Sequence, residues 1–231
     1  MTLLIAHRGD PLVLRENTLP SVASAMTEGA DWVEVDVKLT ADGVPVLLHD
    51  DTLTRLWGHN RRADSLTHRE LEELTRGGDW RIPTLRQALD LARTTGVPLM
   101  IDVPRRAEAL AAAELVLAAD CPELAVFTGP PAALAAVRAA APRACLAMSW
   151  ESPLPPRPQL LRLVRPDYFN PHHRWLTPRR ISRLQGRGLK VSTWTVDCPR
   201  RMAALASAGI DAIISNDLRS LRQVLALNSP K

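Results

Sequence analysis

The chain carries a set of side chains that suits chemistry at a phosphate group, and its members stand in or directly after short apolar runs. The set comprises three carboxylates, two histidines and an arginine beside the first histidine. Its members are Glu34, Asp36, Asp102, His7, His49 and Arg8. Carboxylate oxygens favour a hard cation such as Mg²⁺ or Ca²⁺ over Zn²⁺, and such a cation offsets charge on a phosphate oxygen. The pattern therefore indicates metal-assisted phosphoryl transfer.

The carboxylates are the predicted metal ligands. Glu34 and Asp36 point to one side of a predicted strand, because side chains alternate along a strand with a period of two. Asp102, at the end of a later predicted strand, would complete the site. The plainer interpretation makes Glu34 and Asp36 the solvated face of an edge strand. A buried barrel strand would not tolerate two unpaired carboxylates, so metal binding is favoured.

Arg8 and the two histidines are the predicted groups for substrate binding and proton transfer. Arg8 is expected to bind a phosphate through two N–H groups. His7 and His49 follow different apolar runs, and we expect them to be the acid and the base, since imidazole titrates close to working pH. A single histidine such as His7 would more often be a surface residue, and it is the surrounding set that favours catalysis.

Other polar or aromatic residues near predicted strand ends have simpler interpretations. His172 and His173 are expected at the rim of the site rather than in it, and Trp194 is expected to form an aromatic wall that supports the site. Three residues that precede predicted helices are expected to cap them. These are Asp197, Asn216 and Asp217.

The elements that must position these residues alternate between strands and helices. Apolar runs predict strands over residues 3–6, 32–39, 44–48, 97–103, 124–127, 144–148, 168–171, 190–196 and 212–215. Helical patterns predict helices that begin near residue 19 and over 84–95, 107–119, 132–140, 177–187, 199–208 and up to about 227. About eight strands, most followed by a helix, predict an α/β fold of the TIM (β/α)₈ barrel type. An open doubly wound sheet is the alternative.

The domain organisation is expected to be simple. Residues 1–231 are predicted to form a single TIM-barrel domain, with no repeat that would indicate a second one. Residues 51–82 break the alternation, are polar, and contain only a short helical pattern near Leu66 to Leu74. They are predicted to be a small insertion after the second or third strand, lying over the end of the sheet.

Composition excludes several classes of protein. The 231 residues are 46% hydrophobic and 23% charged, which is an ordinary globular balance. The net charge is only +4 and the arginines are scattered, so no nucleic-acid partner is expected. Three widely spaced cysteines favour a reducing compartment. With neither a signal peptide nor an apolar run of the roughly 20 residues that a membrane span needs, we expect a cytoplasmic protein.

Five motifs together resemble the glycerophosphodiester phosphodiesterase family. They are His7-Arg8-Gly9, Glu16-Asn17-Thr18, Glu34-Val35-Asp36, the Thr40-x-Asp42-Gly43 turn and Val46 to Asp50. Near the other end, Trp194-Thr195-Val196-Asp197 and residues 209–215 are similar to the last two strands of that family. The order and spacing of the pieces match along most of the chain.

The resemblance implies a TIM barrel that hydrolyses glycerophosphodiesters to glycerol phosphate and an alcohol with a divalent cation. It implies that His7 and His49 are the acid and base and that Arg8 binds the phosphate. It makes Glu34 and Asp36 metal ligands. Glu16 is implied to lie near the site and to help order it. The residues after His49-Asp50 correspond to the small insertion of that family.

One departure from the family pattern bears on activity. The family has Glu-x-Lys at the end of the third strand, where this chain has Asp102-Val103-Pro104. Asp is one methylene shorter than Glu, and proline removes a cation, which Arg105 or Arg106 would have to replace. The departure favours, as an alternative, a catalytically weakened or non-hydrolytic barrel that binds phosphodiesters. A lyase or transferase acting on a choline- or inositol-type lipid is a third possibility.

Overall fold

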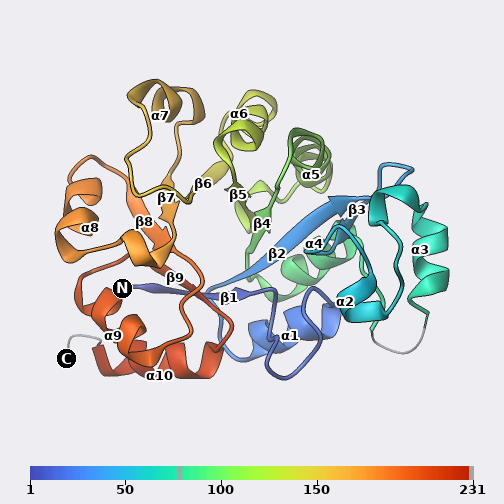
Figure 1. Ribbon diagram of the computed structural model, residues 1–231, viewed down its shortest axis with the longest axis horizontal. Coiled ribbons are helices and arrows are strands. Elements are labelled where there is room, and N and C mark those ends of the chain that lie inside the picture. Colours follow the sequence, from blue (N-terminus) through green and yellow to red (C-terminus); the bar gives the residue numbers. More distant parts are fainter. Residues whose placement is uncertain (77–79, 229–231) are drawn as a thin grey trace.

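The computed structural model describes residues 1–76 and 80–228, and eight parallel strands form a closed barrel at its centre (Figure 1). The barrel closes because β1 pairs with both β2 and β9. The barrel strands are β1 (Leu3–His7), β2 (Trp32–Leu39), β4 (Leu99–Asp102), β5 (Ala125–Gly129), β6 (Cys145–Trp150), β7 (Tyr168–Pro171), β8 (Lys190–Thr193) and β9 (Ala212–Ser215). The predicted TIM barrel is confirmed, and the open sheet is not formed.

Helices surround the barrel and connect successive strands (Figure 1). They are α1 (Leu19–Thr27), α4 (Leu85–Thr95), α5 (Arg106–Ala118), α6 (Pro131–Ala140), α7 (Pro158–Val164), α8 (Pro178–Gln185), α9 (Pro199–Ser207) and α10 (Leu218–Asn228). Two 3-10 helices, η2 (Pro122–Leu124) and η3 (His173–Trp175), lie in connections. Within residues 1–76 and 80–228, no helix is long and apolar enough to span a membrane. The cytoplasmic location stays a prediction.

Alternation along the strands divides the barrel interior into an apolar layer and a polar layer. Ile5, Met100, Val126, Ala147 and Tyr168 belong to one buried cluster that fills the barrel. Neighbouring strand residues pack outward into a separate core under the helices. The residue two positions beyond each of those five points to the same side of its strand, one layer nearer the carboxyl end. These residues are His7, Asp102, Thr128, Ser149 and Asn170.

The predicted strand over residues 44–48 is not part of the barrel. It forms β3 (Pro45–Leu47), which pairs with β2 in antiparallel register, so that Val37 lies opposite Leu47. The Asp42-Gly43 turn joins the two strands, and the φ of +80° at Gly43 suits a tight hairpin. This hairpin carries the chain to His49 at the same end of the barrel as the polar layer.

The segment after His49 holds α2 (Thr54–Trp57), the 3-10 helix η1 (Ala63–Ser65) and α3 (His68–Leu74). Apolar side chains of this segment pack with Val46 and Leu48 of the hairpin in a small core separate from the barrel. Leu53, Leu66, Leu71 and Ile82 are its largest other members. Residues 77–79 of the predicted insertion lie outside the described residues, and its boundary at about 51–82 stays a prediction.

An ion pair between a buried carboxylate and a partly exposed arginine joins the first and last units of the barrel. Asp10, whose side chain has no exposed surface, accepts two hydrogen bonds of 3.0 Å from Arg219 on α10. Ser24 on α1 donates a third hydrogen bond at 2.8 Å. The bonds from Arg219 hold the pKa of the Asp10 carboxyl below its ordinary value, against the opposing effect of burial.

We expect Arg219→Met to lower the free energy of unfolding by about 1.5–3 kcal/mol at neutral pH, because it leaves a buried carboxylate without its charged donors. Since the folded pKa of Asp10 is depressed, this stabilisation is present above the ordinary pKa of 3.8 and is lost as the pH falls through the folded pKa. Urea unfolding at several pH values measures the difference. Arg222→Met, which removes an exposed partner of Glu28, is the matched control. A loss no larger than that of the control would contradict the prediction.

Candidate active site

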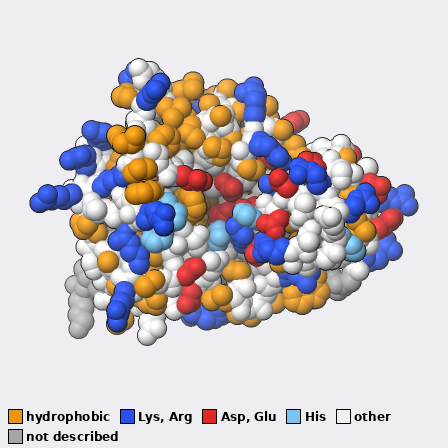
Figure 2. Space-filling model, in the orientation of Figure 1, with side chains coloured by type: hydrophobic (Ala, Val, Ile, Leu, Met, Phe, Trp, Pro, Cys, Tyr) orange, Lys and Arg blue, Asp and Glu red, His pale blue; other side chains and the backbone are white. Residues whose placement is uncertain are grey.

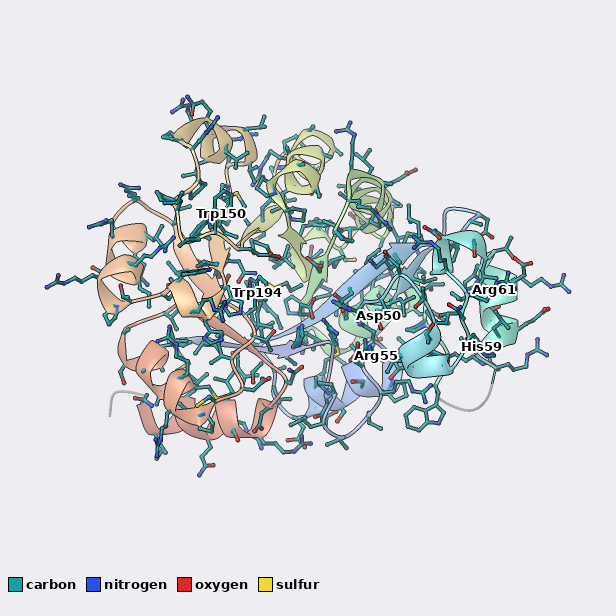
Figure 3. All side chains as sticks on the ribbon, in the orientation of Figure 1. Asp50, Arg55, His59, Arg61, Trp150 and Trp194 are labelled. Carbon is teal, nitrogen blue, oxygen red and sulfur yellow. The ribbon has the colours of Figure 1, made fainter. Side chains whose placement is uncertain are left out.

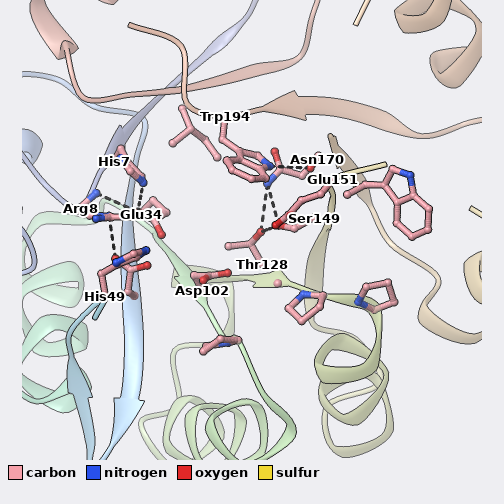
Figure 4. A pocket seen from close by; sticks show the side chains of 17 residues that line it. His7, Arg8, Glu34, His49, Asp102, Thr128, Ser149, Glu151, Asn170 and Trp194 are labelled. Carbon is pink, nitrogen blue, oxygen red and sulfur yellow. Dashed lines mark hydrogen bonds and ion pairs between the residues drawn. The ribbon is translucent and has the colours of Figure 1, made fainter. Parts of the chain in front are cut away.

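A cavity of about 520 Å³ opens at the carboxyl ends of the barrel strands (Figures 2 and 4). In Figure 2 this face is hollowed near its centre, with carboxylate and histidine side chains around the hollow. Seven of the eight predicted site residues line it. These are His7, Arg8, Glu34, Asp36, His49, Asp102 and Trp194. The eighth, Glu16, contacts Arg8 instead. The structure therefore brings the predicted set together, while the roles of its members stay predictions.

Arg8 lies in the middle of the acidic residues. Its Nη1 donates a hydrogen bond of 2.9 Å to Glu16, and its Nε lies 3.1 Å from the Oδ2 of Asp36. Its backbone N–H donates to the Oε2 of Glu34 at 3.0 Å. The backbone has a φ of +58°, a conformation that a non-glycine residue rarely adopts. This turn aims both the amide and the guanidinium of one residue at the carboxylates.

Gly9 makes the turn after Arg8 possible. Its φ is +89°, and a Cβ at this position would lie 2.6 Å from the carbonyl carbon of Ser21. Only glycine fits so close to α1. Asn17, also with a positive φ of +56°, binds the carbonyl oxygen of Arg8 through its backbone N–H and donates its side-chain amide to Asp36 at 2.7 Å. The two local motifs at residues 7–9 and 16–18 are thus parts of one structure.

The three carboxylates lie on two paired strands. Glu34 is aligned with His7 of β1, and Asp36 is aligned with Asp102 of β4. Glu34 and Asp36 are each 5% exposed. Burial raises the pKa of Glu34 well above its ordinary value, and repulsion from Asp36 and Asp102 adds to the rise. Burial and then Asp36 raise the pKa of Asp102 to about 7, with Lys38 and Arg8 opposing.

This donor set fits a hard cation. Three buried carboxylates that repel one another are stabilised by either protons or a positive ion. All-oxygen ligands suit Mg²⁺ or Ca²⁺. Among residues 1–76 and 80–228, no three His, Cys, Asp or Glu side chains are arranged to hold a metal ion as they stand. Small movements of Glu34, Asp36 and Asp102 would therefore have to accompany binding.

The two histidines have different partners, and Glu34 lies between them in Figure 4. The Nδ1 of His7 lies 2.8 Å from the Oδ1 of Asn216, while its Nε2 is 3.9 Å from Glu34. Asp197 accepts the Nδ2 hydrogen of Asn216 at 2.8 Å, which turns the amide oxygen toward His7. The amide oxygen can only accept, so Nδ1 of His7 carries the proton, and Nε2 has the free lone pair.

Burial lowers the pKa of His7, and the charge of Arg8 lowers it further. His7 is therefore a neutral imidazole. His49 is about half exposed, and its Nδ1 lies 2.7 Å from the Oδ1 of Asp50.

A neutral hydrogen-bonding wall faces the carboxylates across the cavity (Figure 4). The hydroxyl groups of Thr128 and Ser149 lie 3.0 Å apart, and the Nδ2 of Asn170 lies 3.4 Å from each. Trp194 donates its indole N–H to the carbonyl oxygen of Asn170 at 3.0 Å, so its ring is fixed beside this wall. Glu151 lines the same side.

Some predictions about individual residues are wrong. Asp197 and Asn216 were expected to cap helices, but Asp197 orients Asn216, and Asn216 contacts His7. Asp217 does accept from the backbone N–H of Ser220 at the start of α10, as expected of a cap. Arg105, a possible replacement for the lysine of the family, is hydrogen-bonded to Glu108 and does not line the cavity.

Other site residues were missed. Thr128, Ser149 and Asn170 follow the strand alternation, which could have found them. Threonine, serine and asparagine are common residue types, and these three belong to no motif that gives another signal. His172 and His173 stack on each other at 4.6 Å and lie outside the residues that line the cavity, as their predicted position at the rim requires.

Comparisons with known proteins agree on one family. Residues 7–220 match the model of the glycerophosphoryl diester phosphodiesterase family. A glycerophosphodiester phosphodiesterase of Caldanaerobacter subterraneus subsp. tengcongensis is 29% identical, with 95% of this chain and 96% of that protein covered. The rat glycerophosphodiester phosphodiesterase 1 is 35% identical, but the match covers 52% of this chain and 39% of the rat protein.

A solved structure has the same fold. An Oleispira antarctica phosphodiesterase in complex with the product sn-glycerol-3-phosphate has a TM-score of 0.89 and 25% identity, with 98% of this chain and 97% of that chain covered. Because the family model spans nearly the whole sequence, this chain belongs to the glycerophosphoryl diester phosphodiesterase family.

Proposed function

We propose that this protein hydrolyses glycerophosphodiesters to glycerol phosphate and an alcohol, with Mg²⁺ or Ca²⁺ as cofactor. The observation that carries the proposal is the convergence of two imidazoles, one guanidinium and three carboxylates on one cavity at the carboxyl ends of the strands. Active sites of (β/α)₈ enzymes occupy this end of the barrel. Two findings support the choice of substrate class: this chain belongs to the family, and the similar Oleispira antarctica phosphodiesterase was solved in complex with sn-glycerol-3-phosphate.

Glu34, Asp36 and Asp102 would hold the cation. When bound, the cation would offset charge on a phosphate oxygen and so stabilise the transition state. The raised pKa values of Glu34 and Asp102 support this role, because both carboxyls lack sufficient positive charge in their surroundings.

Arg8 would bind the non-bridging oxygens of the phosphate. Its guanidinium lines the cavity, and its buried Nε has no hydrogen-bond partner of good geometry in the described part of the chain. Glu16 and Asp36 hold the guanidinium in place before substrate arrives. A fixed, charged donor is worth more in a partly desolvated site than in water.

His7 would be the general base and His49 the general acid. The neutral His7, with its lone pair on Nε2, would take the proton of the attacking hydroxyl, which belongs to water or to the substrate. The bond between phosphorus and the leaving oxygen then breaks as the new oxygen–phosphorus bond forms. His49, half exposed at the cavity and hydrogen-bonded to Asp50, would give a proton to the leaving alcohol.

We expect the purified protein to release glycerol phosphate from glycerophosphocholine in the presence of Mg²⁺ or Ca²⁺. Chelation should abolish turnover, and re-addition of the ion should restore it, because the carboxylates alone bring only negative charge to an anionic substrate. An enzymatic assay for glycerol phosphate measures the product. No release with either ion would refute the proposed function, and full activity after chelation would refute only its metal dependence.

We expect His49→Gln to lower kcat by about 10²- to 10⁴-fold on a substrate with an alkyl leaving group, because glutamine cannot donate a proton to the departing alkoxide. Steady-state kinetics measure the change. His68→Gln is the matched control, since His68 lies on α3 of the same segment, where its Nε2 is 4.0 Å from the exposed Glu72, and it does not line the cavity. Equal effects of the two substitutions would exclude the acid role.

Substitutions of Pro104 test whether the protein hydrolyses phosphodiesters or only binds them. It lines the cavity where family members have lysine. We expect Pro104→Lys to raise kcat/KM by about tenfold, because it adds a charged donor near the phosphate. Pro104→Met, which removes the ring without adding charge, should change little. Undetectable turnover in the native chain together with tight substrate binding would favour the non-hydrolytic barrel instead.

A further inference from the structure

Arg55 of α2 bridges two carboxylates that each hold a predicted site residue. Figure 3 labels Arg55 and one of these partners, Asp50. Its Nε donates to the Oδ2 of Asp50 at 2.6 Å. Its two terminal nitrogens donate to the two carboxylate oxygens of Glu16 at 3.0 and 2.6 Å. The edge of the guanidinium that carries Nη1 and Nη2 therefore binds Glu16, and its Nε binds Asp50. Such paired, charged hydrogen bonds fix both distance and orientation.

The Asp50 side of this bridge leads to the imidazole of His49. Asp50 binds Arg55 with one oxygen and the Nδ1 of His49 with the other, at 2.7 Å. The hydrogen bond from Arg55 is the main cause that lowers the pKa of Asp50 to about 2, so Asp50 is a carboxylate throughout the working range. His49 itself is about half exposed and lies two residues after the three-residue strand β3.

The Glu16 side of the bridge leads to the guanidinium of Arg8. Glu16 accepts from the Nη1 of Arg8 at 2.9 Å with the same Oε1 that accepts from Arg55. Arg8 keeps a second anchor in Asp36, whose Oδ2 lies 3.1 Å from its Nε. Removing Arg55 would therefore leave Arg8 held, whereas Asp50 would keep only His49 as a side-chain hydrogen-bond partner among residues 1–76 and 80–228.

We propose that Arg55 is a positioning residue that sets the proton-donating imidazole of His49 at a fixed place relative to the phosphate bound by Arg8. It acts through Asp50 on one side and through Glu16 on the other. The inference rests on the proposed function. It assigns a task to the segment after β3, which supplies Arg55 from the short helix α2 (Thr54–Trp57).

The packing of the segment does not depend on this residue. The small core beside the barrel is made of aliphatic side chains and one partly buried tryptophan, Trp57, and Arg55 is not among them. The Arg55 side chain is 46% exposed. The guanidinium lies outside the core, and its three nitrogens bond to two carboxylates. Its contacts therefore fix where those carboxylates lie.

The test compares two substrates that differ in how much the leaving group needs a proton. Glycerophosphocholine releases an alkyl alcohol, whereas the p-nitrophenyl diester of glycerol phosphate releases a stable phenolate. We expect Arg55→Gln to lower kcat on the first by about 10²-fold and to change kcat on the second less than about threefold, with KM nearly unchanged on both. Arg55→Lys keeps the positive charge but not the planar set of N–H donors, and it should lower kcat about tenfold on the first substrate alone.

Two further variants keep the test decisive. Asp50→Asn should show the same selective loss, and adding it to Arg55→Gln should lower kcat no further, because both act through one imidazole. Arg69→Gln is the control, since Arg69 pairs with Glu73 on the exposed face of α3. Equal losses on both substrates, or no loss, in folded Arg55 and Asp50 variants would overturn the inference while native turnover upholds the proposed function. A native protein inactive on both substrates would refute the proposed function itself.

Discussion

The guanidinium of Arg8 among the carboxylates of Glu16, Glu34 and Asp36 is the interaction on which the site depends. Two of these acids are almost wholly buried, and a buried carboxylate without a positive partner is strongly unfavourable. The cluster can exist only if Arg8 turns back into the barrel, which requires the strained backbone at Arg8 and the glycine after it. Stability and the proposed binding of the phosphate thus both require Arg8 to turn back into the barrel.

The barrel decides which side chains meet this cluster. Because the strands are parallel and staggered in register, His7 lies beside Glu34, and Asp36 lies beside Asp102. The same alternation that fills the lower interior with Ile5 and Met100 places polar residues one layer higher. The apolar layer makes the fold stable without the site, and the polar layer is free to hold charges that the fold does not need.

Much of this could be predicted from the sequence, because period-two alternation and the alternation of strands with helices are local patterns. They gave the barrel and the shared face of Glu34 and Asp36. The contact between His7 and Asn216 joins residues 209 positions apart and leaves no local pattern, so Asn216 looked like a helix cap. Arg55 was missed for a similar reason, since its partner Glu16 lies 39 positions away. The hairpin strand β3 was recognised as a strand, but only the register with β2 reveals that it lies outside the barrel.

The two histidines show how the fold makes unlike groups from like residues. His7 is enclosed beside Arg8, and burial and then the charge of Arg8 lower its pKa, whereas its hydrogen bond with the Asn216 amide opposes that fall. His49 stands near solvent and is bonded to a carboxylate. Hydrolysis of a diester needs one group that takes a proton while another gives one. The two imidazoles also have different partners: Asn216 is delivered by the end of β9, and Asp50 is delivered by the β2–β3 hairpin. A barrel closed by its first and last strands therefore brings the amide to His7, while a short antiparallel extension brings the carboxylate with His49.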